Sequence, residues 1–159
     1  MKKLLIFSLF ISLFITSACA SPKRENVQIQ EKMKVKAFFS NNTLDPEISC
    51  QKVFPVEREV AKTPAVARVA LSELLAGVTP AEKEAGFFTS LNPEIKIQSL
   101  TIENGVARVD FSKQLEAGVG GSCRVSAIRA QIISTLKQFP SVEEVIISID
   151  GRSEDILQP

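Results

Sequence analysis

The sequence predicts an α+β fold, a two-layer sandwich in which two main helices pack on a small mixed β-sheet. The elements follow the order strand, edge strand, helix, β-hairpin, helix, strand. Both main helices are amphipathic, so each must bury an apolar stripe against a sheet. No internal repeat or linker interrupts residues 33–151, and we therefore expect one domain over that range.

Two strands are expected in the first half of the domain, at residues 33–39 and 53–60. In the first, MKVKAFF, every second residue is apolar, which is the alternation of a half-buried strand. In the second, VFPVEREV, Pro55 cannot donate a hydrogen bond to a ladder, so we expect an edge or covering strand. Residues 40–52 between them are rich in turn formers and predict a long loop.

A helix with clear ends follows at residues 62–78, KTPAVARVALSELLAGV. We expect Thr63 as its N-cap and Pro64 at its first helical position. Its valine, alanine and leucine residues recur at helical spacing and form one apolar stripe. The next segment, TPAEKEAG, predicts a short helical turn in which Thr79 and Glu82 form a capping box.

Residues 94–112, EIKIQSLTIENGVARVDFS, predict a β-hairpin around the NG pair, because both residues of that pair tolerate a positive φ angle. The alternation of apolar residues changes phase near Gln98. A β-bulge at that point would place Ile97 opposite Phe111 and keep both on the buried face.

A second main helix is expected at residues 122–139, where apolar residues recur at spacings of three and four. We expect Ser122 to cap this helix and Pro140 to end it. Gln131 is expected to lie on the ordinary surface of the helix. VEEVIISID then forms the last strand, and a polar tail over residues 152–159 follows the domain.

The N-terminus, MKKLLIFSLFISLFITSACA, has a basic start, an apolar run and small residues, the layout of a secretory signal peptide over residues 1–18. The apolar run is shorter than the roughly 20 residues of a membrane-spanning helix. TSAC resembles a bacterial lipobox, so we expect cleavage before Cys19 and lipid on its sulfur. Residues 19–32 would then be a polar, disordered tether at the outer face of the bacterial membrane. Cleavage after Ala20 is the alternative and would leave a secreted or periplasmic protein.

The composition excludes several kinds of site. The chain has no His, Trp or Tyr, and its formal net charge is +1. Without His, the chain cannot form a Ser-His-Asp triad, a Cys-His dyad or an imidazole metal site. The small net charge does not suggest the basic face that nucleic-acid binding needs. Asp45 and Glu47 alone do not make a series of calcium ligands, and we expect no metal and no cofactor.

The stretch AGVGGSCRVSAIRAQ, residues 117–131, allows three interpretations. Its glycines and Arg124 could cradle a phosphate, although the GKS/T ending of such loops is missing. Cys123 near a helix start could be an activated thiol. We favour a disulfide between Cys50 and Cys123, because two cysteines in an exported domain most often pair, and this bridge would contribute about 4 kcal/mol. Arg58 and Arg124 remain candidate surface contacts.

Four segments together resemble one known family. VFPVEREV and TPAVARVALSELLAGVTPAEKEAG are followed by IENGVARVDFS and by IRAQIISTLKQFPSVEEVIISIDG. In this order and spacing they resemble the GerMN domain of sporulation and spore germination, over residues 33–151. The resemblance implies an exported lipoprotein and a fold similar to the ring-building motif, a wedge of helices on a three-stranded sheet. No catalytic residue is carried over, because the resemblance implies none.

Together these observations predict a non-catalytic lipoprotein domain of the cell envelope, related to sporulation or germination, and not an enzyme. We expect it to bind an unknown envelope protein or to assemble, with a homo-oligomer left open, and to reach the membrane through its N-terminal lipid. The alternative is an envelope module that binds a small molecule or a cell-wall fragment. A flat, exposed apolar patch would favour the first hypothesis, and a preformed pocket with convergent polar groups would favour the second.

Overall fold

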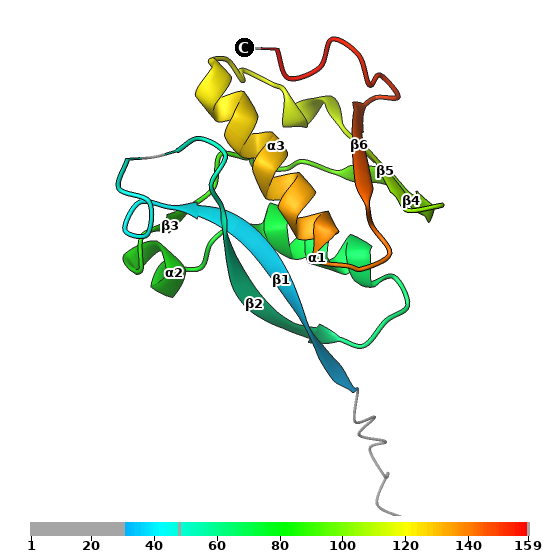
Figure 1. Cartoon of the computed structure of the whole chain (residues 1–159), viewed down its shortest axis with the longest axis horizontal. Coiled ribbons are helices and arrows are strands. Elements are labelled where there is room, and N and C mark those ends of the chain that lie inside the picture. The colour runs from blue at the N-terminus through cyan, green and yellow to red at the C-terminus, as the bar shows by residue number, and fades with distance from the viewer. Residues whose placement is uncertain (1–30, 48, 159) are drawn as a thin grey trace, which may run out of the picture.

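The computed structural model describes residues 31–47 and 49–158 (Figure 1). The strands are β1 (Lys32–Asn41), β2 (Phe54–Ala61), β3 (Phe87–Phe88), β4 (Ile97–Glu103), β5 (Val106–Phe111) and β6 (Glu144–Ile149). The helices are α1 (Val66–Ala76), α2 (Pro80–Glu84), the 3-10 turn η1 (Lys113–Leu115) and α3 (Ser122–Lys137). The expected signal peptide, the lipidated Cys19 and nearly all of the expected tether lie outside the described residues.

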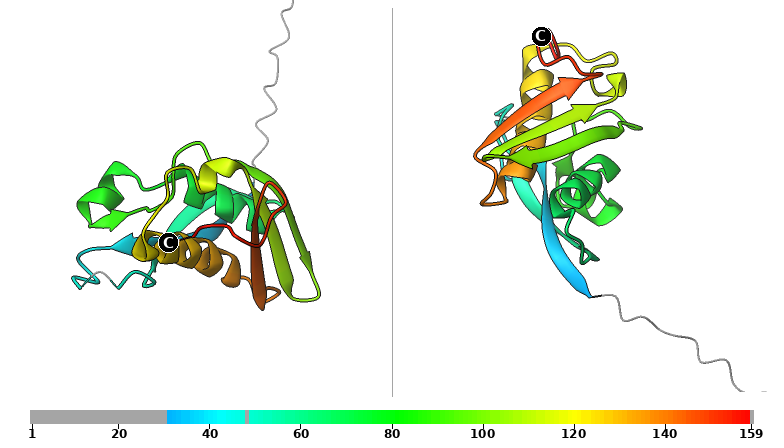
Figure 2. Two further views of the ribbon diagram at one scale, coloured as in Figure 1. Left: turned by 90° about the horizontal axis from the view of Figure 1, so that it is seen from above. Right: turned by 90° about the vertical axis from the view of Figure 1, so that its right-hand side faces the viewer.

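The α+β class is confirmed, but the strands form two sheets where we expected one. The first sheet has the order β2-β1-β3, and the second, mixed sheet has the order β4-β5-β6. The main helices α1 and α3 contact each other and both contact β1, and they reach the second sheet through β4 and β6. Seen from the side of the second sheet, its strands lie in front of α3, and β1 runs behind (Figure 2). The helices therefore separate the two sheets.

The hairpin β4–β5 has the predicted register. Ile102 pairs with Ala107 and Leu100 pairs with Val109, and the register shifts just before Ser99, as expected for a bulge. This shift brings Ile97 opposite Phe111, which confirms the prediction. Strand β6 then adds to β5 in parallel.

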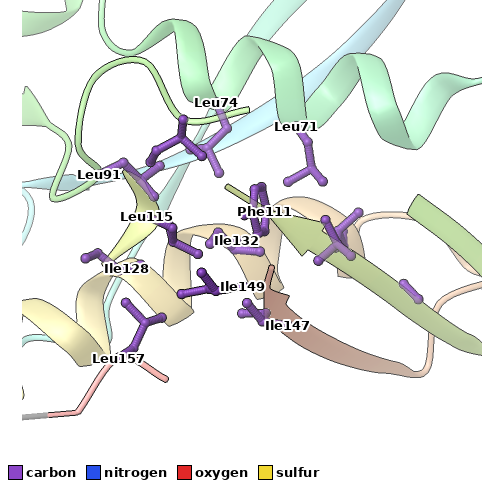
Figure 3. Close-up of a cluster of buried hydrophobic side chains, with 14 of the residues drawn as sticks. Leu71, Leu74, Leu91, Phe111, Leu115, Ile128, Ile132, Ile147, Ile149 and Leu157 are labelled. Carbon is purple, nitrogen blue, oxygen red and sulfur yellow. The ribbon is translucent and has the colours of Figure 1, made fainter. Parts of the chain in front are cut away.

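One hydrophobic core joins the helices and both sheets (Figure 3). Leu71 and Leu74 of α1 face Phe111 of β5, while Ile128 and Ile132 of α3 point into the same space. The apolar stripes that the sequence indicates on both helices are therefore the buried ones.

The C-terminal segment belongs to this core, although we expected a polar tail over residues 152–159. Ile156 and Leu157 are almost completely buried. The guanidinium of Arg129 donates a hydrogen bond to the carbonyl of Ile156 at 3.0 Å, which holds the segment against α3. Two apolar residues in a short irregular segment give no periodic signal, so only packing shows that the domain extends to them.

Two of the expected helix caps are wrong. Helix α1 begins at Val66 with Ala65 as its N-cap, and the hydroxyl of Thr63 instead accepts a hydrogen bond from the Ala65 amide at 3.2 Å. Helix α3 begins at Ser122 itself, and its N-cap is Gly121 with φ of 84°. That angle suits glycine and strains other residues, so the backbone conformation sets the start of α3.

Three polar side chains of α3 and its C-cap, namely Gln131, Thr135 and Gln138, face β1, and we call them the α3 clasp. The Phe38 amide donates to the Thr135 hydroxyl at 3.1 Å, and the Lys36 amide donates to Gln138 at 2.8 Å. Gln138 also donates to the Lys36 carbonyl at 2.6 Å. The clasp takes the place of a neighbouring strand on this part of the β1 edge, which is a recognised way to protect an edge.

Gln131, which we expected on the helix surface, is completely buried. Its amide group accepts a hydrogen bond from the Thr89 hydroxyl at 2.9 Å and donates to the Ser40 hydroxyl at 3.4 Å. Its burial could be predicted from the sequence, because Gln131 lies three residues after the apolar Ile128, which is buried, and therefore lies on the same face of the helix.

Candidate functional site

The structure joins Cys50 and Cys123 in a disulfide whose Cα atoms are 5.0 Å apart. The two cysteines are 73 residues apart in the sequence. Cys50 lies in the loop between β1 and β2, and Cys123 lies in the first turn of α3. The bridge therefore ties the long first loop to the helix that begins after the glycine run.

Arg124, the next residue, holds the glycine run in place. Its guanidinium donates to the Gly118 carbonyl at 3.2 Å, to Asn92 at 2.7 Å and to the Ser90 carbonyl at 3.4 Å. Asn92 in turn donates to the carbonyl of Ala117 at 2.8 Å. The predicted surface contact is thus a partly buried link between two loops, and three of the guanidinium's N–H groups are used inside the chain.

A cavity of about 290 Å³ lies beside the disulfide. It is partly open to solvent and is bordered by the end of β1, the disulfide loop, β3 and the first turns of α3. Its lining consists of Ser40, Asn41, Asp45, Ser49, Cys50, Lys52, Phe88, Ser90, Cys123, Arg124 and Ala127. The sequence singles out three of these residues, the two cysteines as a disulfide pair and Arg124 as a surface contact.

Asp45 is the one carboxylate in this lining, and it is 6% exposed. Its two oxygens accept hydrogen bonds from the amide and the hydroxyl of Ser49, at 2.7 and 3.0 Å. The ammonium of Lys52 lies 3.6 Å from the same carboxylate and 5.6 Å from the centroid of the Phe54 ring. Asp45 therefore organises the loop, and no set of three or more acidic or cysteine ligands in the described residues could hold a metal ion.

Arg58, the other predicted surface contact, lies at a different place and is mostly buried. Its side chain is 13% exposed and forms a bidentate ion pair with Glu82. It also donates to the Gly77 carbonyl at 3.2 Å, lies 3.5 Å from Glu73, and stacks 5.8 Å from the ring centroid of Phe39. The structure thus uses Arg58 to join β2 to α1 and α2.

Glu82 has a second role, because it completes the predicted capping box. The Thr79 amide donates to its carboxylate at 2.8 Å, and the Glu82 amide donates to the Thr79 hydroxyl at 3.3 Å. Burial by itself raises the pKa of Glu82, but the hydrogen bonds from Arg58 and Thr79 outweigh burial and hold this pKa below its ordinary value. The charged carboxylate therefore stabilises the fold at neutral pH, and this contribution is lost as the pH falls through its lowered pKa.

On the outer edge of β2, backbone amide and carbonyl groups have no hydrogen-bond partner within the described residues. In an antiparallel pair, only every second residue of a strand forms backbone hydrogen bonds with the partner strand. The amides of Lys36 and Phe38 point to α3, so in this part of β1 the residues that alternate with them form the hydrogen bonds with β2. Lys36 lies opposite Glu57, and the amides and carbonyls of Glu57 and Glu59 accordingly point away from β1. Within residues 31–47 and 49–158, no hydrogen-bond partner occupies them.

The comparisons with known proteins agree on one fold. The tandem GerMN domains of the sporulation protein GerM from Bacillus subtilis match with a TM-score of 0.60 and 20% identity, over 77% of this chain and 41% of that chain. The first GerMN domain of the same protein matches with a TM-score of 0.55 and 20% identity, over 76% of this chain and 85% of that chain. The chain thus spans less than half the length of the tandem structure. No curated protein matches.

The match at the family level covers about the same part of the chain and is more direct. Residues 36–155 match the Germane family, described as Sporulation and spore germination. This range includes every strand and helix of the fold except the start of β1, residues 32–35. The chain therefore belongs to the Germane family of sporulation and spore-germination domains.

Proposed function

We propose that this domain is a non-catalytic module of the cell envelope that acts in sporulation or germination by binding an extended segment of another envelope protein. In this proposal the signal peptide over residues 1–18 directs export, and a lipid on Cys19 attaches the domain to the membrane. In the described part of the chain, no helix is long and apolar enough to cross a membrane.

The open edge of β2 is the observation that supports this proposal. An extended peptide can add to such an edge through main-chain hydrogen bonds alone, as many recognition domains do. Here Glu57 and Glu59 each offer an amide and a carbonyl on the same side, and Pro55 limits the addition at the end near the disulfide loop.

The charges beside this edge define the partner. Lys34 and Glu57 form an ion pair at 2.8 Å on the exposed face of the two strands, and Lys32 pairs with Glu59 at 3.0 Å. A strand added next to β2 would lie directly beside the two glutamates. Since opposite charges stabilise neighbouring strands and like charges destabilise them, we expect a partner segment with basic side chains at alternate positions.

The reactive groups of the domain support a non-catalytic role. Cys50 and Cys123 are oxidised, and the carboxylate of Asp45 is occupied by Ser49. Arg58 and Arg124 bind groups of the chain itself. These side chains act on the fold, which leaves recognition through the surface as the function that the geometry supports best.

A proline at Glu59 tests the open edge. Because the Glu59 amide points away from β1, Glu59→Pro removes a donor from the edge but no hydrogen bond from the β1–β2 ladder. We expect a photo-crosslinker at position 57 to capture an envelope protein in cells, with capture reduced about tenfold or more by Glu59→Pro. Glu59→Ala removes the same side chain but keeps the amide, so it serves as the control and should lose much less of the capture than Glu59→Pro.

Two results would contradict strand addition. One is undiminished capture by a Glu59→Pro variant that unfolds at the same temperature as the natural protein. The other is a captured segment that contacts position 57 but lacks basic side chains and shows no extended hydrogen-bond pattern by amide exchange.

The cavity favours a second candidate function, the binding of a small molecule. The structure contains a preformed pocket with convergent polar groups, whereas Leu44 is the one large apolar side chain that is exposed among the described residues. A lone exposed leucine does not make an apolar docking patch.

A further inference from the structure

We propose that the cavity beside the disulfide binds a small carboxylate with a short apolar body. This site is separate from the open edge of β2, because its lining includes no residue of β2. The proposal rests on the volume of the cavity, on the hydrogen-bond donors left over in its lining, and on its apolar wall.

The volume restricts the ligand to a small molecule. At about 290 Å³ the cavity lies just below the range of roughly 300–1,000 Å³ that is typical of ligand sites. Its walls come from four parts of the chain that the disulfide and Arg124 hold together. The pocket is therefore built by the fold and does not depend on a partner chain.

Unused hydrogen-bond donors remain in the lining. Arg124 has five N–H groups and uses three of them on Ser90, Gly118 and Asn92. The hydroxyl of Ser40 is 7% exposed and accepts a hydrogen bond from Gln131, but no acceptor in the described residues faces its own hydrogen. A buried hydroxyl of this kind can donate to a ligand.

The charges in the lining favour an anion. Lys52 and Arg124 carry two positive charges, and Asp45 carries one negative charge that the Ser49 amide and hydroxyl already satisfy. A cationic ligand would meet two cations and an occupied carboxylate. A carboxylate ligand could accept charge-assisted hydrogen bonds from Arg124 and Lys52. It could also accept a hydrogen bond from the buried hydroxyl of Ser40.

The rest of the lining is apolar and selects the body of the ligand. The ring of Phe88, the methyl group of Ala127 and the disulfide form this part of the wall. An alkyl chain of a few carbons would cover these groups and remove them from water. An inorganic phosphate has no such body and would leave the apolar wall exposed.

Titration of the oxidised protein with butyrate tests the proposal. Chemical shifts of the Ser90 and Cys123 amides should change and saturate, while butyramide and butylamine, its neutral and cationic counterparts, should bind about tenfold more weakly or not at all. Inorganic phosphate is the fourth probe and should also bind more weakly than butyrate.

Variants locate the binding. Lys52→Gln should weaken butyrate binding about tenfold, and Ser40→Ala, which removes one buried donor and leaves the loop charges in place, should weaken it several-fold. Lys62→Gln is the matched control, because Lys62 is an exposed lysine paired with Glu31 outside the cavity, and it should leave binding unchanged.

Three outcomes would overturn the proposal: no saturable shift with butyrate, equal binding of butyrate and butyramide, or unchanged binding in folded Lys52→Gln and Ser40→Ala variants. The Glu59→Pro variant separates this proposal from the previous one. It should bind butyrate normally even though it loses the captured partner.

Discussion

The two halves of strand β1 differ in the surroundings of their polar side chains, which are buried in one half and exposed in the other. In the inner half, from Ala37 to Asn41, the side chains of Ala37 and Phe39 are completely buried, and the polar groups of Ser40 and Asn41 are buried as well. In the outer half, from Lys32 to Lys36, Val35 is buried but the three lysine side chains are exposed, and two of them, Lys32 and Lys34, pair with glutamates of β2. Only the outer half and its partner strand extend away from the helices (Figure 1).

The difference shows how one strand can serve both stability and recognition. The inner half is bounded by β2 on one edge and by β3 and the α3 clasp on the other. The outer half has β2 on one edge and meets the clasp on the other edge only at Lys36, through Gln138, and the far edge of β2 remains open. Stability should therefore depend on groups around the inner half, while changes in the outer half should alter binding and leave stability nearly unchanged.

The largest effect is expected from the disulfide next to the inner half. Replacing both Cys50 and Cys123 by alanine should lower the free energy of unfolding by about 4 kcal/mol, because the unfolded chain regains the entropy of a long open loop. Urea unfolding followed by circular dichroism measures this loss. In the unfolded, non-reduced natural domain these two cysteines should not react with a thiol reagent, and two reactive thiols from them would refute the pairing.

The α3 clasp should give the intermediate effect. Gln131→Ala removes the donor to the Ser40 hydroxyl and the acceptor of the Thr89 hydroxyl and opens a small cavity, so we expect a loss of about 2–3 kcal/mol in unfolding free energy. Gln138→Ala is the matched variant at the outer end of the clasp, where water can replace the lost bonds, and it should cost about 1 kcal/mol. Equal losses in the two variants would show that the inner half is not the more tightly held part.

The smallest effect is expected from the exposed ion pair of the outer half. The hydrogen bond and charge of Lys34 hold the pKa of Glu57 below its ordinary value, and the same pair raises the pKa of Lys34. The ion pair therefore favours the folded state at pH values between the pKa of Glu57 and the pKa of Lys34. Its contribution is lost as the pH falls through the pKa of Glu57 or rises through the pKa of Lys34. Both groups are fully exposed, so Lys34→Ala should not measurably change stability.

A titration followed by NMR checks this last prediction. In Lys34→Ala the carboxyl of Glu57 should titrate closer to its ordinary pKa, and 1 M salt should produce a similar change in the natural protein because it screens exposed charges. Lys62→Ala should leave the titration of Glu57 as it is. A large loss of stability in Lys34→Ala would mean that the outer half supports the fold more than its exposure suggests.

Local patterns predicted the parts of this fold that depend on neighbouring residues. The NG turn and the change of phase at Gln98 predicted both the register and the bulge of the β4–β5 hairpin. The capping box of Thr79 and Glu82 formed as predicted, because both partners lie in one turn of helix. In each case the stabilising contact spans a few residues and leaves a pattern in the sequence.

The candidate site was predictable only in part. Cysteine counting pointed to Cys50 and Cys123, and position beside the glycine run pointed to Arg124. The cavity itself was not predictable, because Ser40, Asp45 and Phe88 come from separate segments that meet only in the folded chain. The sequence predicts Arg58 as a surface contact, since nothing near it in sequence reveals its pairing with Glu82.

By itself the sequence determined the kinds and order of the main elements, the apolar stripes of the helices and the local turns, because periodicity and turn chemistry act within short stretches. It did not predict the two short elements β3 and η1. Tertiary structure alone decided that the strands divide into two sheets and that Ile156 joins the core. It also decided which edge of β1 receives the α3 clasp and which edge of β2 stays open. The physical reason is the same throughout: a backbone edge or an apolar side chain is satisfied by whichever distant segment the packing brings beside it.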